Sequence, residues 1–212
     1  MEKIGEKPMM HYVIENFINQ GFDDIVITLH YMPNVITDYF GDGSHFGAKI
    51  TYAYEEKLMG TAGSIKKMER YLSDDFFVCS GSYLPETLDL NEIVKCHREN
   101  KALGTVVLAS CVDQKQLSNF GQAVINAEKQ IVRFEEKPKS NFSDLVHTTY
   151  QIYSPSVFSY IPENVYYTLP DDVIPQILQS KNTYGYVYNG RLFGISTVEA
   201  YNETKQLLCP DL

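Results

Sequence analysis

The strongest constraint on the fold is a stretch in which a predicted strand runs through a glycine-containing turn into a predicted helix. Residues 48–54 alternate apolar and polar types, as in a strand, and residues 62–72 have helical apolar spacing. Between them lies Gly60-Thr61-Ala62-Gly63. Small residues at the electropositive start of a helix let a flat or phosphorylated ligand reach backbone N–H groups. An ordinary tight turn capped by Thr61 is the alternative, and the turn alone leaves both interpretations open.

The same alternation of helices and strands runs through the first half of the chain. Helices are predicted at residues 7–20, 34–40, 62–72 and 90–100, and strands at residues 25–29, 48–54, 76–80 and 104–110. This order predicts an α/β fold with a mostly parallel, Rossmann-like doubly wound sheet and helices on both faces. The first helix comes almost at once, so we expect the chain to lack the strand and glycine-rich loop that normally begin such a domain.

The second half of the chain predicts a small antiparallel β part. Strands are expected at residues 120–126, 130–135 and 145–153, and helices at residues 155–160, 171–178 and 198–208. Asn189-Gly190 is a preferred two-residue turn, so residues 184–188 and 192–196 are predicted to pair as a hairpin. Asp171-Asp172 resembles a metal clamp, but we favour a helix cap, because carboxylates stabilise the positive end of a helix.

Composition limits the class of protein. A chain of 212 residues with 44% hydrophobic residues can bury a substantial core. Its net charge of −9 disfavours nucleic acid as a partner. No apolar run is long enough to span a membrane, and the cysteines form no metal-binding pattern. We therefore expect a cytoplasmic protein with no membrane or nucleic-acid partner.

Several short motifs give the chain a family resemblance. They are Glu6-Lys7-Pro8-Met9, Tyr39-Phe40-Gly41-Asp42-Gly43, Leu58-Met59-Gly60-Thr61-Ala62-Gly63-Ser64, Phe120-Gly121, Phe134-Glu135-Glu136-Lys137-Pro138 and Asp172-Val173-Ile174-Pro175. In order and spacing the chain resembles the sugar-1-phosphate nucleotidyltransferases, such as glucose-1-phosphate thymidylyltransferase and mannose-1-phosphate guanylyltransferase. The resemblance implies transfer of a nucleotidyl group from an NTP to a sugar 1-phosphate, with release of pyrophosphate. It also implies one domain over residues 1–212, with a nucleotide-binding half (1–112) and a sugar-binding half (113–212).

The resemblance also assigns candidate site residues. The nucleotide would lie against Glu55, Gly60, Thr61, Ala62 and Gly63, and the sugar phosphate against Gly121, Glu136, Lys137 and Thr149. Gly121 would let the backbone approach the sugar, Glu136 would bind sugar hydroxyls, and Lys137 would bind the phosphate as a mobile point charge. A solvated strand end stopped by Pro138 is the alternative for Glu136 and Lys137.

The sequence departs from the family where the chemistry takes place. The family holds Mg²⁺ with two aspartates, and here Ser82 and Gly194 occupy these positions. Mg²⁺ prefers carboxylate oxygens, so its binding here is doubtful, and Glu86 is the one nearby substitute to test. His147-Thr148-Thr149 replaces the family's Asn-Ala-Gly, which puts a β-branched side chain where glycine would admit the sugar. The family's arginine-containing loop and catalytic lysine would precede Met1, so we expect an N-terminally truncated and divergent member.

These observations leave two main hypotheses about function. One is a nucleotidyltransferase with a rearranged site, and the other is a pseudoenzyme that keeps the fold to bind a sugar phosphate, a nucleotide or an active partner subunit. A shared fold does not decide between them, because activity depends on the site. A homo- or hetero-oligomer is expected by analogy with the family. A glycosyltransferase is a weaker third hypothesis, since no suitably placed Asp-x-Asp metal motif is found.

Overall fold

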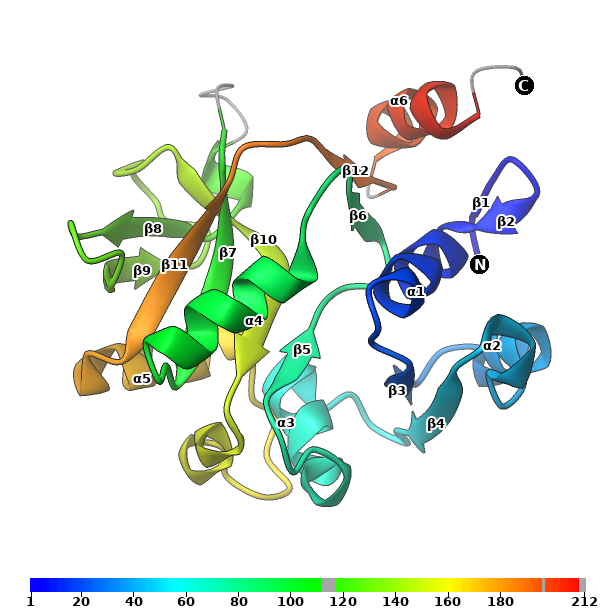
Figure 1. Cartoon of the computed structure of the whole chain (residues 1–212), viewed down its shortest axis with the longest axis horizontal. Helices are drawn as coiled ribbons and strands as arrows, with labels where there is room; N and C mark the ends of the chain where they lie inside the picture. The colour runs from blue at the N-terminus through cyan, green and yellow to red at the C-terminus, as the bar shows by residue number, and fades with distance from the viewer. Residues whose placement is uncertain (112–116, 196, 210–212) are drawn as a thin grey trace. The chain divides into compact units, whose positions relative to one another are not determined.

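The computed structural model describes residues 1–111, 117–195 and 197–209 (Figure 1). The chain forms two compact units, each built from separated segments. The first unit contains residues 1–54, 79–90 and 190–212, and the second contains residues 55–78 and 91–189. The unit boundaries do not coincide with the expected division at residue 112, and the assignment of that division to nucleotide and sugar stays a prediction.

The first unit contains three small pairs of strands. Its elements are β1 (Lys3–Ile4), β2 (Lys7–Pro8), α1 (Met9–Asn19), β3 (Asp24–Leu29), α2 (Pro33–Phe40), the 3₁₀ turn η1 (Ser44–Phe46), β4 (Lys49–Tyr54), β6 (Tyr83–Pro85), β12 (Leu192–Gly194) and α6 (Val198–Leu208). Strands β3 and β4 pair in parallel, whereas β1 with β2 and β6 with β12 pair antiparallel. The predicted helix–strand alternation of this region is confirmed.

Two faces of α1 bury different sets of apolar side chains. Ile14 packs with Ile27 of β3 and Phe40 of α2, which closes the parallel pair from one side. Met9 and Val13 pack instead with residues of β6 and β12. Helical spacing explains this division, because residues three and four positions apart lie on one face of a helix. Helix α1 therefore joins the β3–β4 pair and the β6–β12 pair into one core.

The second unit contains the large sheet. Its elements are α3 (Gly60–Lys67), η2 (Glu69–Tyr71), β5 (Phe76–Val78), α4 (Leu90–Glu99, whose first residue belongs to the first unit), β7 (Gly104–Ser110), η3 (Leu117–Asn119), β8 (Gln122–Ile125), β9 (Ile131–Glu135), β10 (Leu145–Tyr153), η4 (Pro155–Tyr160), the π turn η5 (Leu169–Val173), α5 (Ile174–Ile177), η6 (Leu178–Ser180) and β11 (Thr183–Tyr188). Six strands form a sheet in the order β11-β7-β10-β8-β9, with β5 also paired to β10. Strand β7 pairs in parallel with β11, and β10 pairs antiparallel with β5, β7 and β8. The α/β class is confirmed, and antiparallel pairing extends further than the small part expected.

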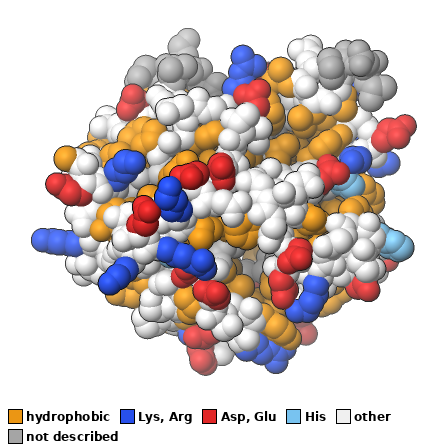
Figure 2. All heavy atoms as spheres, in the orientation of Figure 1, with side chains coloured by type: hydrophobic (Ala, Val, Ile, Leu, Met, Phe, Trp, Pro, Cys, Tyr) orange, Lys and Arg blue, Asp and Glu red, His pale blue; other side chains and the backbone are white. Residues whose placement is uncertain are grey.

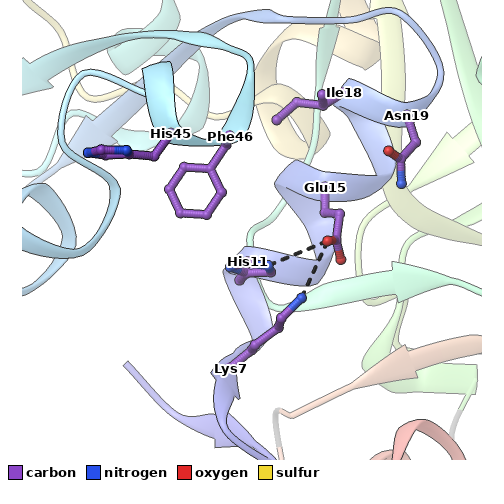
Figure 3. A pocket seen from close by; sticks show the side chains of 7 residues that line it. All are labelled: Lys7, His11, Glu15, Ile18, Asn19, His45 and Phe46. Atoms are coloured by element: carbon purple, nitrogen blue, oxygen red, sulfur yellow. Dashed lines mark hydrogen bonds and ion pairs between the residues drawn. The ribbon is translucent and has the colours of Figure 1, made fainter.

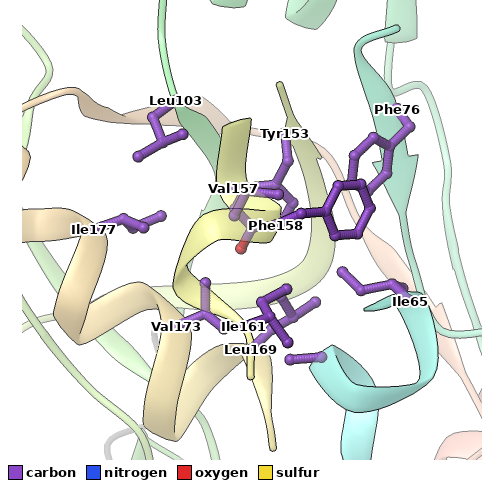
Figure 4. Packing of buried hydrophobic residues seen from close by; sticks show 11 residues of the cluster. Ile65, Phe76, Leu103, Tyr153, Val157, Phe158, Ile161, Leu169, Val173 and Ile177 are labelled. Atoms are coloured by element: carbon purple, nitrogen blue, oxygen red, sulfur yellow. The ribbon is translucent and has the colours of Figure 1, made fainter. Parts of the chain in front are cut away.

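The core of the second unit is organised around aromatic rings (Figure 4). Phe76 of β5 stacks on Phe158 of η4, with ring centroids 5.3 Å apart. Tyr153 at the end of β10 is fully buried beside them, and a side-chain carbon on Gly104 would lie 2.8 Å from its ring. Gly104 therefore gives Tyr153 room against β7. Such buried aromatic area contributes strongly to core stability.

The predicted hairpin between residues 184–188 and 192–196 is wrong. Strand β11 pairs over six residues with β7 in the second unit, whereas β12 pairs with β6 in the first unit. Asn189-Gly190 favours a local reversal of the chain, but pairing with distant strands overrides that preference. Two predicted helices also differ from the structure: α3 ends at Lys67 before a 3₁₀ turn, and a π turn precedes α5. The predicted lack of the family's first strand stays a prediction.

The longest helices in the described part of the chain have 11 residues. No helix there combines the length and the apolar character needed to cross a membrane. On the face shown in Figure 2, acidic and basic side chains are interspersed.

Buried histidines predict a loss of stability in acid. Burial lowers the pKa of His147 from 6.5 to about 4, and burial also lowers the pKa of His97. The unfolded chain therefore binds more protons than the folded chain below pH 6.5, so stability is full above that pH and falls as the pH drops toward about 4. We expect His147 to contribute a slope of up to about 1.4 kcal/mol per pH unit.

Urea unfolding at several pH values measures this slope. His147→Asn, which restores the family residue, should flatten it, whereas His30→Asn at an exposed position should not. An unchanged slope in His147→Asn would assign the acid sensitivity to other groups.

Candidate functional site

The turn at residues 60–63 is held by backbone hydrogen bonds from within the second unit. Gly60 has φ +71°, and a side-chain carbon there would lie 2.4 Å from the Tyr167 carbonyl oxygen, so only glycine fits. The N–H groups of Ala62 and Gly63 donate to that same oxygen at 2.9 and 3.0 Å. The Thr61 hydroxyl accepts from the N–H of Leu169 at 2.8 Å. The Ala62 and Gly63 amides therefore have an acceptor inside the protein, and nucleotide binding at these two residues stays a prediction.

Two candidate nucleotide contacts, Glu55 and Gly60, have properties that are common at ligand-binding sites. Glu55 is a buried carboxylate, 8% exposed, on the segment that leads to this turn. Buried carboxylates are costly and concentrate at functional sites. Gly60 brings its backbone close to Tyr167 without any side chain. Nucleotide binding by Glu55 and by residues 60–63 stays a prediction.

Gly121 and Glu136, two of the predicted sugar contacts, lie together. A side-chain carbon on Gly121 would come within 2.5 Å of a Glu136 carboxylate oxygen, and the Gly121 carbonyl accepts from the His147 N–H at 2.8 Å. Burial raises the pKa of Glu136, the Lys137 charge lowers it, and the Asp171 charge raises it. Glu136 is thus a half-buried acceptor over bare backbone, which suits a hydroxyl-bearing ligand.

The predicted sugar contacts also include two strained residues. Lys137 has φ +45° and Thr149 has φ +72°, a conformation that is a genuine outlier for a β-branched residue. Thr149 lies in a bulge of β10, where the register to β7 shifts between His147 and Gln151. Its buried hydroxyl has no hydrogen-bond partner among the described residues. Backbone strain of this kind concentrates at functional sites, and here it marks the position where the family has glycine.

One polar turn links the two groups of candidate residues. Thr168 accepts from the Asp171 N–H through its hydroxyl, and Asp172 accepts from the Thr168 N–H at 2.7 Å, which confirms the predicted helix cap. The same turn bonds to Thr61 through Leu169 and places the Asp171 charge near Glu136. The motif at Asp172 pointed to this turn. The role of the Tyr167 carbonyl could not be predicted, because a backbone atom leaves no residue-type signal.

Ser82 and Gly194, the positions where the family resemblance predicts aspartates, lie close to each other in the first unit. Gly194 of β12 pairs with Tyr83 of β6, and Ser82 directly precedes Tyr83. The Ser82 hydroxyl lies 2.7 Å from the Ser80 hydroxyl, and a side-chain carbon on Gly194 would lie 2.6 Å from the Tyr83 ring. No pattern in the sequence predicts that the Tyr83 ring lies against Gly194. Its ring occupies the place where a second carboxylate side chain would begin.

The residues at these positions do not fit a magnesium ion. Ser82 offers one neutral hydroxyl and Gly194 offers no side chain, whereas Mg²⁺ requires hard oxygen ligands, usually carboxylates. Across the described residues, no three His, Cys, Asp or Glu side chains are grouped to hold a metal. Glu86, the one nearby carboxylate named for testing, follows the opposite end of β6, about 13 Å along the strand direction from Ser82 at ~3.3 Å per residue. Glu86 is therefore a poor substitute.

The strained bulge yields a stability prediction. Thr149→Gly should stabilise the protein by about 1 kcal/mol, because relief of ~1–3 kcal/mol of left-handed strain exceeds the entropy cost of glycine. Thr148→Gly is the matched control, and it should destabilise, since Thr148 donates to the Val107 carbonyl at 2.9 Å. Thermal unfolding of both variants measures the difference. A loss of stability in Thr149→Gly would show that its φ carries no strain.

The chain resembles known nucleotidyltransferases over nearly its whole length. A family described as nucleotidyl transferase matches residues 1–206. A UTP–glucose-1-phosphate uridylyltransferase of Synechocystis sp. is 33% identical over 194 residues, covering 85% of this chain and 50% of that protein. UTP–glucose-1-phosphate uridylyltransferase AglF of Haloferax volcanii is 27% identical and covers 74% of this chain and 64% of its own. The chain thus spans roughly half to two thirds of these curated relatives.

The fold has counterparts among solved structures. A structure from Bacillus anthracis, named for glucose-1-phosphate thymidylyltransferase, superposes with a TM-score of 0.87 at 23% identity, covering 100% of this chain and 86% of that one. At this identity the likeness establishes the fold alone. The family match and the Synechocystis relative carry the assignment further. The chain belongs to the sugar-1-phosphate nucleotidyltransferase family.

Proposed function

We propose that this chain keeps the family's ligand-binding region but does not catalyse magnesium-dependent nucleotidyl transfer through the Ser82 and Gly194 positions. The observation that carries the proposal is the Tyr83 ring, 2.6 Å from where a Gly194 side chain would start. The difference from the family is therefore a repacked site rather than a simple exchange of side chains. In sugar-nucleotide biosynthesis such a chain would act as a non-catalytic binding or regulatory subunit.

The chemistry explains why these positions matter. Attack of a sugar phosphate on a nucleoside triphosphate brings anions together, so the transition state needs cations to absorb charge. A divalent ion supplies several kcal/mol of that stabilisation, or roughly three or more powers of ten in rate. Ser82 is neutral and already hydrogen-bonded to Ser80, so it does not replace the charge of an aspartate.

Ligand binding rests on residues that remain suited to it. The Glu136 carboxylate stands over the Gly121 backbone, and Lys137 supplies an exposed cation on the next residue. These groups match the hydroxyls and the phosphate of a sugar 1-phosphate. The nucleoside triphosphate would use Glu55, Gly60 and Thr61.

A paired assay tests transfer and binding separately. With Mg²⁺, the full chain should release no pyrophosphate above background from UTP, GTP, dTTP or ATP with glucose 1-phosphate or mannose 1-phosphate. Calorimetry should still detect binding of at least one sugar phosphate. Lys137→Met should weaken that binding about tenfold or more, because a charge-assisted hydrogen bond is lost, whereas Lys139→Met should not.

The outcomes of this assay are distinct. Magnesium-dependent turnover that is lost in Lys137→Met would overturn the non-catalytic role and support a working enzyme with a rearranged site. Absence of both turnover and sugar-phosphate binding would overturn the binding role.

Repacking around Tyr83 makes a further prediction about stability. Gly194→Ala should destabilise by about 1–3 kcal/mol, because the new carbon forces the Tyr83 ring to move. In a Tyr83→Ala background the same change should cost less than about 0.5 kcal/mol, since the clash is gone. Equal costs in both backgrounds, measured by urea unfolding, would show that Tyr83 does not exclude a side chain at position 194.

A further inference from the structure

A pocket lies within the first unit, between α1 and η1 (Figure 3). Its volume is about 270 Å³, or room for about nine water molecules at ~30 Å³ each. Lys7, His11, Glu15 and Asn19 line one wall, and Phe46 lines the other. None of these residues belongs to the candidate functional site, so the two sites can be tested independently.

The polar wall follows from the spacing of residues along α1. His11, Glu15 and Asn19 are four positions apart, which places them on one face of the helix. This face is polar, whereas Met9 and Val13 on another face enter the core. Helix α1 thus presents a row of hydrogen-bonding groups, of which His11 contacts the Phe46 ring.

The charges of the pocket lining balance one another. The Lys7 ammonium donates to Glu15 Oε1 at 3.3 Å, and His11 Nε2 lies 3.7 Å from the same oxygen. His11 is 7% exposed, and its Nδ1 lies 3.1 Å from the Tyr39 hydroxyl. Burial, and then the Lys7 charge, lower the pKa of His11, so its ring is neutral at pH 7. The lining therefore holds one lysine and one carboxylate, already paired with each other, and His45 beside Phe46.

We propose that this pocket binds a neutral polyhydroxylated ligand of monosaccharide size. An ionised carboxylate has about four acceptor sites, and Lys7 uses one of those on Glu15, so ligand hydroxyls can donate to the others. The Asn19 amide can donate and accept, and the Phe46 ring offers an apolar face. An anionic ligand would face Glu15, and a cationic ligand would face Lys7, so the neutral lining favours a neutral ligand.

The position of Phe46 is fixed by its neighbours. Its ring meets the edge of His11 with centroids 5.2 Å apart and stacks on Tyr39 with centroids 6.3 Å apart. A ring held in this way forms a ready-made wall, and preorganisation lowers the cost of binding.

NMR titration of the ¹⁵N-labelled full chain tests the proposal, with D-glucose and myo-inositol as probes and inorganic phosphate as the anionic comparison. At least one polyol should shift the amide resonances of Asn19, His45 and Phe46 saturably, with Kd on the order of millimolar. Phosphate should not shift them. The Gly121 amide reports separately on the candidate functional site.

Two variants and one control identify the site. Glu15→Gln should raise Kd about tenfold, because it removes a charged hydrogen-bond acceptor, and Asn19→Ala should raise it severalfold. Asn34→Ala, exposed on α2, should leave Kd unchanged. The proposal is overturned if neither polyol shifts the pocket amides, if only Gly121 responds, if both pocket variants bind like wild type, or if phosphate saturates the pocket instead.

Discussion

The bulge in β10 is the constraint on which the second unit depends. One edge of this strand pairs with β7, while the other pairs with β8 near its start and with β5 near its end. A straight strand would keep one register throughout, but β10 shifts register between His147 and Gln151. That shift places Thr149 at φ +72°. The same feature that lets β10 join its neighbours therefore shapes the backbone beside Gly121 and Glu136, so the sheet and the candidate sugar site share one structural cause.

The candidate residues of the second unit are supported by hydrogen bonds and packing, whereas those of the first unit depart from the pattern that the family resemblance predicts. In the second unit, one polar turn supports both the Gly60 region and the surroundings of Glu136 through Leu169 and Asp171. In the first unit, the strand pair that carries Ser82 and Gly194 is intact, but Tyr83 fills the space beside Gly194. In the proposed function, binding and catalysis depend on different residues. One can therefore be kept while the other is removed, as a non-catalytic family member requires.

Much of the fold could be predicted from the sequence because hydrophobic period and turn chemistry are local signals. Strands β3, β4, β7 and β10 appear within a residue or so of their expected ranges. The hairpin at Asn189-Gly190 was mispredicted because pairing partners are chosen by the whole sheet, and a two-residue signal carries no information about β7 or β6. The motifs indicated Gly121 and Glu136 as contacts of the same ligand, and the structure places these two residues next to each other. They could not reveal that the Tyr167 carbonyl takes the Ala62 and Gly63 amides, since any residue supplies a carbonyl.

The interleaving of the two units has a consequence for synthesis on the ribosome. All strands of the large sheet lie within residues 76–188, so the second unit can finish folding while the tail is still being translated. The first unit cannot finish folding at that stage, because β6 pairs with β12, which is translated later. The Lys3 carbonyl likewise accepts a hydrogen bond from the Tyr201 hydroxyl at 3.0 Å, and Tyr201 is translated later still. The N-terminal strands and helices of the first unit therefore stay incompletely folded, and exposed to proteases, until α6 has been translated.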